Sequence, residues 1–213
     1  MTDRRITLFH APNTRSTGTL ILLEELGADY ELELLDFGRN EQRSPDYLAV
    51  NPMGKVPAIR HAGAVVTEQV AIYVYLADLY AERGLAPPPG DPLRGPYLRW
   101  LVFYGTCFEP AIVDRSQKRE PGSVAGSPYG DYDTMLGAVM QRIEQGPYML
   151  GERFTAADVL WGIALGLTTS WGLVPRTPAV QRYVEAFDAR PAVIRARSRD
   201  AELAASLGKV APP

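Results

Sequence analysis

The groups best placed to hold a ligand lie in residues 51–58 and in the pair Glu68-Gln69. Pro57 has no N–H and begins a predicted strand, and the Val56–Pro57 bond is a position where a cis peptide is accessible. We expect the N–H and C=O of Val56 to face outward without a partner, as an added peptide strand requires. Glu68 and Gln69 lie at a helix start, whose free N–H groups favour an anion. The pattern predicts a peptide-like ligand with charged ends, held by the backbone.

The elements that position these groups begin with a βαβ unit. β-Branched and aromatic residues at 6–10 predict a buried strand, and alternating apolar and acidic residues at 30–35 predict a second strand. Between them lies an apolar helix that Ser16 or Thr17 can cap and that Gly27 closes. This order predicts two parallel strands joined by a right-handed crossover.

A second group of elements completes the domain. A short helix capped by Ser44 is followed by strands at residues 58–61 and 64–67, joined by a tight antiparallel turn. Apolar residues at helical spacing then predict a helix over residues 68–80. The order βαβαββα predicts an α/β, thioredoxin-like domain over residues 1–81.

A proline-rich segment at residues 82–96 predicts a domain linker, and residues 97–213 carry only helical patterns. The expected helices cover residues 98–108, 131–145, 155–167, 178–188 and 191–207. Pro110 should kink or end the first of them, because proline disrupts a helix interior. Asp158 completes a capping box that opens the third. The C-terminal part is therefore predicted to be an all-α domain.

The composition excludes several classes of function. The chain has 213 residues, 46% of them hydrophobic, and a formal net charge of −3, which predicts neither a nucleic-acid partner nor a membrane surface. A single cysteine, Cys107, excludes an internal disulfide framework and a multi-cysteine metal site, and we expect no metal. No apolar leader precedes the first predicted strand, and no apolar run reaches the length of a membrane span. We therefore expect a cytoplasmic protein.

The motifs together resemble the cytosolic glutathione transferases over nearly the whole chain. The resemblance is carried by the order and spacing of residues 22–27, 51–58, 67–72 and 155–158. It implies a thioredoxin-like domain followed by a helical domain, in a homodimer. It also implies glutathione as a co-substrate, with no resident cofactor.

The resemblance assigns roles in glutathione binding by position. Val56, ahead of Pro57, should hold the cysteinyl part through its backbone, and Lys55 should contact the ligand near its glycyl end. Glu68 and Gln69 should hold the γ-glutamyl end. The family most often has a serine after this glutamate, so Gln69 departs from the pattern.

A basic residue after the second strand should bind the glycyl carboxylate. Arg39 and Arg43 are both available, and the motif does not choose between them; we take Arg39 as the candidate.

These enzymes need a glutathione thiolate, and a free thiol has a pKa of about 8.5. One hydrogen bond to the thiolate, at about 1.5–3 kcal/mol, together with a helix N-terminus is sufficient to form it near neutral pH without a histidine or a metal. Family members place Tyr, Ser or Cys in the loop at residues 12–17, and this chain has neither Tyr nor Cys there. The candidates, in order of preference, are Ser16, Thr14 and Asn13. Ser16 has an alternative interpretation as the helix cap alone.

By the same resemblance, the helix after the linker lines the electrophile pocket, which makes Tyr104 and Phe108 candidates for its wall. The chain is thus expected to be a glutathione S-transferase that conjugates glutathione to small hydrophobic electrophiles, as in detoxification. The alternatives are a glutathione-dependent isomerase, a thiol reductase, and a catalytically silent module that binds proteins.

Overall fold

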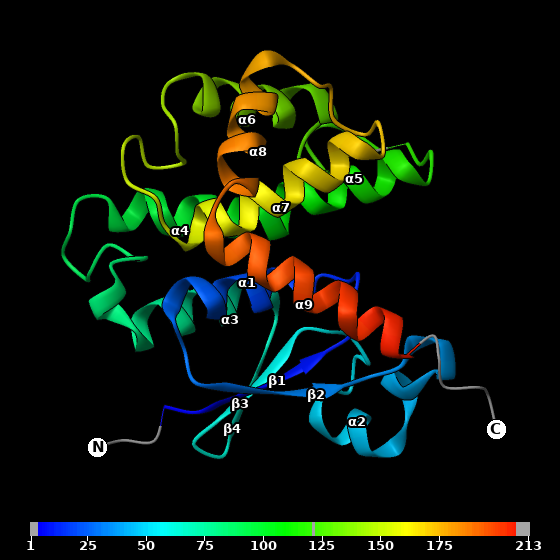
Figure 1. The fold of residues 1–213 in the computed structure, drawn as a ribbon. Helices are drawn as coiled ribbons and strands as arrows, with labels where there is room; N and C mark the ends of the chain where they lie inside the picture. The colour runs from blue at the N-terminus through cyan, green and yellow to red at the C-terminus, as the bar shows by residue number, and fades with distance from the viewer. Residues whose placement is uncertain (1–3, 121, 208–213) are drawn as a thin grey trace. The chain divides into compact units, whose positions relative to one another are not determined.

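The computed structural model describes residues 4–120 and 122–207, and the chain divides after Arg83 and before Arg190 into two compact units. The first unit contains a four-stranded sheet (Figure 1). Its strands are β1 (Ile6–His10), β2 (Tyr30–Leu34), β3 (Ala58–His61) and β4 (Ala64–Thr67), in the order β2-β1-β3-β4. The β1–β2 pair is parallel and the other two pairs are antiparallel, which confirms the predicted mixed sheet.

Helices cover both faces of this sheet (Figure 1). The helices of the first unit are α1 (Ser16–Leu26), α2 (Pro45–Val50), α3 (Gln69–Leu79) and α9 (Pro191–Leu207), with 3-10 turns at Phe37–Arg39, Glu41–Arg43 and Ala81–Arg83. α1 and α3 lie on one face and α2 on the other. Gly27 ends α1 in the left-handed conformation at φ 58°, and Ser44 caps α2, both as predicted.

The alternation of side chains along β1 decides what each face of the sheet meets. Phe9 points to the α2 face, where its ring lies 5.7 Å from that of Tyr47 in a small apolar cluster. The residues on either side of it, Leu8 and His10, point to the opposite face, and both are fully buried. A polar His10 in this position needs partners, and they come from α1 and α9.

The second unit is helical, as predicted. Its elements are α4 (Arg94–Phe103), a π-helical segment (Tyr104–Phe108), α5 (Glu109–Ser116), α6 (Tyr132–Glu144), α7 (Ala156–Ser170) and α8 (Pro178–Asp188). Pro110 does not end this helical stretch, which was one of the two outcomes predicted for it. It lies in the first turn of α5, where its missing N–H costs little, and the π-helical segment directly before it joins α4 to α5.

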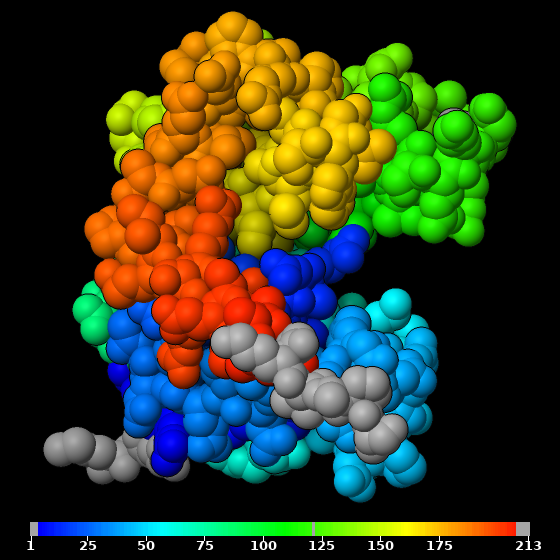
Figure 2. All heavy atoms as spheres, turned by 45° about the vertical axis from the view of Figure 1, so that its right-hand side comes forward, coloured from blue at the N-terminus to red at the C-terminus, as the bar shows by residue number. Residues whose placement is uncertain are grey.

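The compact units differ from the predicted domains at the C-terminal end, because α9 belongs to the first unit. α9 packs along α1, as Figures 1 and 2 show. Arg190, just before α9, forms a two-pronged ion pair with Glu25 at 2.5 and 2.8 Å, and Arg195 pairs with Glu24 at 3.0 Å. Arg190 and Arg195 therefore help to dock α9 onto α1.

None of the helices within residues 4–120 and 122–207 is both long enough and apolar enough to cross a membrane. No group of three or more His, Cys, Asp or Glu side chains in this described part of the chain could hold a metal ion.

Candidate functional site

The Val56–Pro57 peptide bond is cis, the isomer that the sequence made accessible. Within the described part of the chain, no hydrogen bond reaches the N–H or the C=O of Val56. The neighbouring carbonyl of Lys55 is held firmly, because it accepts from Tyr47 Oη at 2.6 Å and from Asn51 Nδ2 at 2.8 Å. Burial raises the pKa of Tyr47 to about 12, so this phenol stays a donor. The backbone N–H and C=O of Val56, here called the Val56 edge, are thus unpaired, and the hydrogen bonds to the neighbouring Lys55 carbonyl fix their position.

Gly54 shapes the turn that leads to this edge. Its φ is +59°, and a Cβ at this position would lie 2.8 Å from the carbonyl oxygen of Gln42. We expect Gly54→Ala to lower the free energy of unfolding by about 1–3 kcal/mol, since both the backbone conformation and the space oppose a side chain. Urea unfolding measures this loss. Gly63→Ala is a suitable control: it also has a positive φ, but open space around the Cβ, and a loss as large as that of Gly54→Ala would exclude the steric contribution.

The start of α3 lies beside the loop at residues 12–17. Glu68 precedes the helix at φ 64° and ψ 115°, a strained conformation for a residue other than glycine, and its side chain is exposed. Gln69 begins the helix, and its Nε2 donates to the carbonyl of Arg15 at 3.3 Å. Gln69 Oε1 is buried without a hydrogen-bond partner among the described residues. The sequence-predicted Glu68-Gln69 pair is therefore brought next to the loop that carries the predicted thiol donors.

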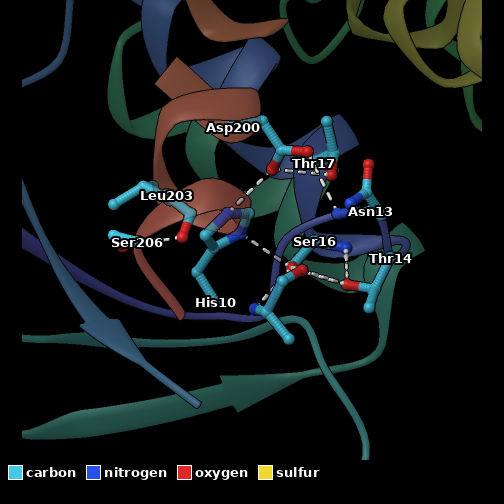
Figure 3. A network of polar contacts seen from close by, with 9 residues as sticks. His10, Asn13, Thr14, Ser16, Thr17, Asp200, Leu203 and Ser206 are labelled. Carbon is cyan, nitrogen blue, oxygen red and sulfur yellow. Dashed lines mark hydrogen bonds and ion pairs between the residues drawn. The ribbon is translucent and has the colours of Figure 1, made fainter. Parts of the chain in front are cut away.

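A connected set of polar groups fills the region between β1 and α1 (Figure 3). Ser16 is fully buried, and its Oγ accepts from the Ala11 N–H at 3.1 Å and lies 2.8 Å from both His10 Nδ1 and Thr14 Oγ1. Thr14 Oγ1 also donates to the Ala11 carbonyl at 2.7 Å. The interpretation of Ser16 as the cap of α1 is wrong: the helix begins at Ser16 itself with no side-chain cap, because the hydroxyl is committed to this network.

Asp200 of α9 closes the network from the other side (Figure 3). Its Oδ2 accepts from the Asn13 N–H at 3.0 Å, and its Oδ1 accepts from the Thr17 hydroxyl at 3.0 Å. His10 Nε2 lies 2.9 Å from the same Oδ1, an ion-pair contact without the alignment of an ideal hydrogen bond. Burial alone raises the pKa of Asp200, but the contacts from His10, Asn13 and Thr17 outweigh it and hold that pKa below its ordinary value.

The predicted donors differ in how far they reach solvent. Ser16 is fully buried, Thr14 is half-buried and Asn13 is exposed. Asn13 has a φ of 59°, a left-handed conformation that asparagine tolerates better than most residues. The sequence analysis did not find Asp200, which lies 187 positions beyond its partner Asn13. The available signal was its place in the series Ala192, Ala196, Asp200, which puts a carboxylate on the buried stripe of a helix.

The remaining predicted residues occupy two settings. Lys55 and Arg39 are exposed in the first unit, where Arg39 Nε is 3.9 Å from Glu41. Tyr104 and Phe108 lie in the π segment of the second unit, exposed by only 7% and 1%. Their rings stack at 5.9 Å and both pack against Trp161. They are part of an aromatic cluster within the helical unit.

The chain is similar to known proteins in sequence and in structure. Residues 4–78 match the family model of the glutathione S-transferase N-terminal domain. The glutathione S-transferase GstA of Escherichia coli O157:H7 is 30% identical over 186 residues, which cover 84% of this chain and 92% of that protein. Two solved structures align with 92% of this chain. A glutathione transferase from Methylococcus capsulatus is 33% identical, with a TM-score of 0.78 and 99% of its chain covered. A sphingomonad glutathione S-transferase complexed with glutathione is 30% identical, with a TM-score of 0.75 and 98% of its chain covered.

The identity and coverage of these relatives together show that the chain belongs to the glutathione S-transferase family.

Proposed function

We propose that the protein is an enzyme that transfers glutathione, as its thiolate, to small hydrophobic electrophiles. The observation that carries the proposal is the unpaired and rigid Val56 edge, which lies in the same unit as the start of α3 and the loop at residues 12–17. A tripeptide held as an extra strand on Val56 satisfies both of its free backbone groups. The solved relative with bound glutathione supports this choice of tripeptide.

The charged ends of glutathione have complementary partners in this unit. We propose that Glu68 and Gln69 receive the γ-glutamyl end, where exposed Glu68 pairs with the ammonium group and the N–H groups of α3 attract the carboxylate. Lys55 and Arg39, both exposed, are the proposed partners of the glycyl carboxylate. Pro57 contributes shape only, since it has no N–H. Glutathione is consumed as a co-substrate in this scheme, and the chain's own residues perform the activation.

We propose Thr14 as the donor to the thiolate. The sequence ranked Ser16 first, but the full burial of Ser16 favours Thr14, which is half-buried and lies in contact with Ser16. Asn13 remains the alternative donor, because its side chain is exposed in the same loop. Ser16 then holds the Thr14 hydroxyl in position through the 2.8 Å contact between their oxygens.

The electrophile is proposed to contact the aromatic segment of the second unit. Tyr104 exposes 7% of its surface and Phe108 only 1%, so Phe108 would act by stacking on Tyr104 and fixing its ring. Membership of the family also supports a homodimer as the working form. Analytical ultracentrifugation tests this assembly.

Substitutions of the loop test the proposed function and the donor together. We expect Thr14→Val to raise the pKa of bound glutathione by about 1–2 units, because one hydrogen bond to a charged group is worth about 1.5–3 kcal/mol. The measurement is the ultraviolet absorbance of the bound thiolate as a function of pH. Thr14→Ser, which keeps the hydroxyl, should restore the parent value, and Ser16→Ala should give a smaller rise.

Other outcomes would redirect the proposal. If the pKa of bound glutathione rises more in Ser16→Ala than in Thr14→Val, the donor is Ser16. If that pKa rises only in Asn13→Ala, the donor is Asn13. Glutathione binding without any thiolate signal would support the catalytically silent module. Thiolate formation with turnover of mixed disulfides but not of electrophiles would support the reductase.

A further inference from the structure

The proposed function leaves the buried His10–Asp200 pair without a role. His10 is fully buried, the side chain of Asp200 is 6% exposed, and the two come from β1 and α9. Burying a charge without a partner is costly, so such a pair has to be stabilised by its surroundings. Its surroundings are the loop that carries the proposed thiol donor.

The contacts form a continuous chain from the Asp200 carboxylate to Thr14 (Figure 3). Asp200 Oδ1 is 2.9 Å from His10 Nε2, His10 Nδ1 is 2.8 Å from Ser16 Oγ, and Ser16 Oγ is 2.8 Å from Thr14 Oγ1. Both hydroxyls have a single hydrogen and can also accept, so each can pass on the direction of the hydrogen bond before it.

The direction of this chain depends on the hydrogens of His10. An ionised carboxylate only accepts, so the contact with Asp200 requires a hydrogen on Nε2. If Nδ1 also has a hydrogen, it donates to Ser16, and both acceptor positions of the Ser16 oxygen are then filled, by His10 and by the Ala11 N–H. Ser16 then gives its own hydrogen to Thr14 or to the Ala11 carbonyl at 3.0 Å and takes none from Thr14, so the Thr14 hydrogen is divided only between that carbonyl at 2.7 Å and the sulfur of the ligand. If Nδ1 has none, Ser16 donates back to His10 and accepts from Thr14, which draws the Thr14 hydrogen away from the ligand.

We propose that Asp200 is a positioning residue for thiol activation: it pairs with a doubly protonated His10 and so directs the hydroxyl chain of Ser16 and Thr14 toward the sulfur of glutathione. Asp200 is the one acidic side chain that the described structure places against His10. It also fixes the loop directly, through the Asn13 N–H and the Thr17 hydroxyl. The inference rests on the proposed function.

Asp200→Asn tests the inference with a nearly isosteric change. An amide has one accepting oxygen where the carboxylate has two, and it is no counter-ion for a protonated imidazole. We expect the pH midpoint of bound thiolate to rise by about one unit, so that kcat/KM measured below the midpoint falls about tenfold. Glu25→Gln is the matched control, because it removes the ion pair with Arg190 beside α9 without touching the loop, and its midpoint should equal that of the parent.

A second measurement needs no glutathione. The chain has only two histidines, so the ring-nitrogen NMR signals of His10 can be assigned by comparison with His61→Gln. We expect hydrogens on both His10 nitrogens in the parent and on one in Asp200→Asn. If Asp200→Asn does not fold, Ser16→Ala interrupts the same chain and should also raise the midpoint.

The outcomes separate the inference from the proposed function. A normal thiolate signal in the parent with an unchanged midpoint in Asp200→Asn overturns the inference alone, as does a parent His10 with one ring hydrogen. If the thiolate midpoint rises equally in Glu25→Gln, the inference is also overturned, since weaker docking of α9 would then explain the rise seen in Asp200→Asn. A parent that binds no glutathione as thiolate overturns the proposed function, whatever the NMR signals of His10 show.

Discussion

Replacing Asp158 with alanine is expected to lower the free energy of unfolding of the helical unit by about 3–5 kcal/mol. Asp158 is 1% exposed and accepts four hydrogen bonds. Its Oδ2 accepts from the N–H and the hydroxyl of Thr155, and its Oδ1 accepts from the Met149 N–H at 2.6 Å and from Tyr183 Oη at 2.8 Å. A cap residue alone is worth about 0.5–2 kcal/mol. The larger value is expected because each buried donor left without an acceptor costs about 1–3 kcal/mol.

Tryptophan fluorescence during urea unfolding measures this loss, because Trp100, Trp161 and Trp171 all lie in the helical unit. Asp131 provides the matched control. It caps α6 with bonds to the N–H and hydroxyl of Thr134 alone, near the surface, so Asp131→Ala should have a clearly smaller effect. Equal losses for the two variants would mean that the bonds to Met149 and Tyr183 contribute nothing beyond capping.

Asp158 also shows what the sequence could and could not predict. The capping box at residues 155–158 is a local pattern, and it correctly predicted where α7 begins. The bonds to Met149 and Tyr183 join side chains whose meeting depends on tertiary packing, so no local pattern contains them. The same distinction explains the missed α5: a rule about Pro110 is local, whereas the π turn that accommodates it depends on the packing of the aromatic segment at residues 104–108.

The candidate site divides in the same way. The Val56–Pro57 edge and the start of α3 were predicted from residues that act through their own backbone. The contact between His10 and Asp200 was not, since Asp200 reaches His10 from the far end of the chain. Sequence reasoning ranked the thiol donors by residue type and offset, and it had no means of knowing that Ser16 is fully buried.

Gly162→Ala is expected to destabilise the helical unit, although alanine is intrinsically better in a helix by about 1 kcal/mol. Gly162 lies inside α7, facing Phe187 of α8. A Cβ at this position would lie 2.3, 2.5 and 2.6 Å from three carbons of the Phe187 ring. Such distances force the ring or α8 to move, and overpacking of this kind costs about 1–3 kcal/mol, occasionally more. We therefore expect a net loss in the free energy of unfolding, measured by tryptophan fluorescence in urea.

Gly166, one turn further along α7, makes the comparison decisive. A Cβ there would lie 3.5 Å from Val184 Cγ1, an ordinary contact, so Gly166→Ala should stabilise the unit by about 0.5–1 kcal/mol. The same change in the same helix is thus expected to have opposite signs at the two positions, because only Gly162 meets a ring. In a Phe187→Leu background the loss caused by Gly162→Ala should shrink, as expected for two residues in direct contact. If Gly162→Ala instead raises the free energy of unfolding, α8 or the Phe187 ring can move aside without measurable loss. Backbone entropy, and not the close approach to Phe187, would then determine the effect at this position.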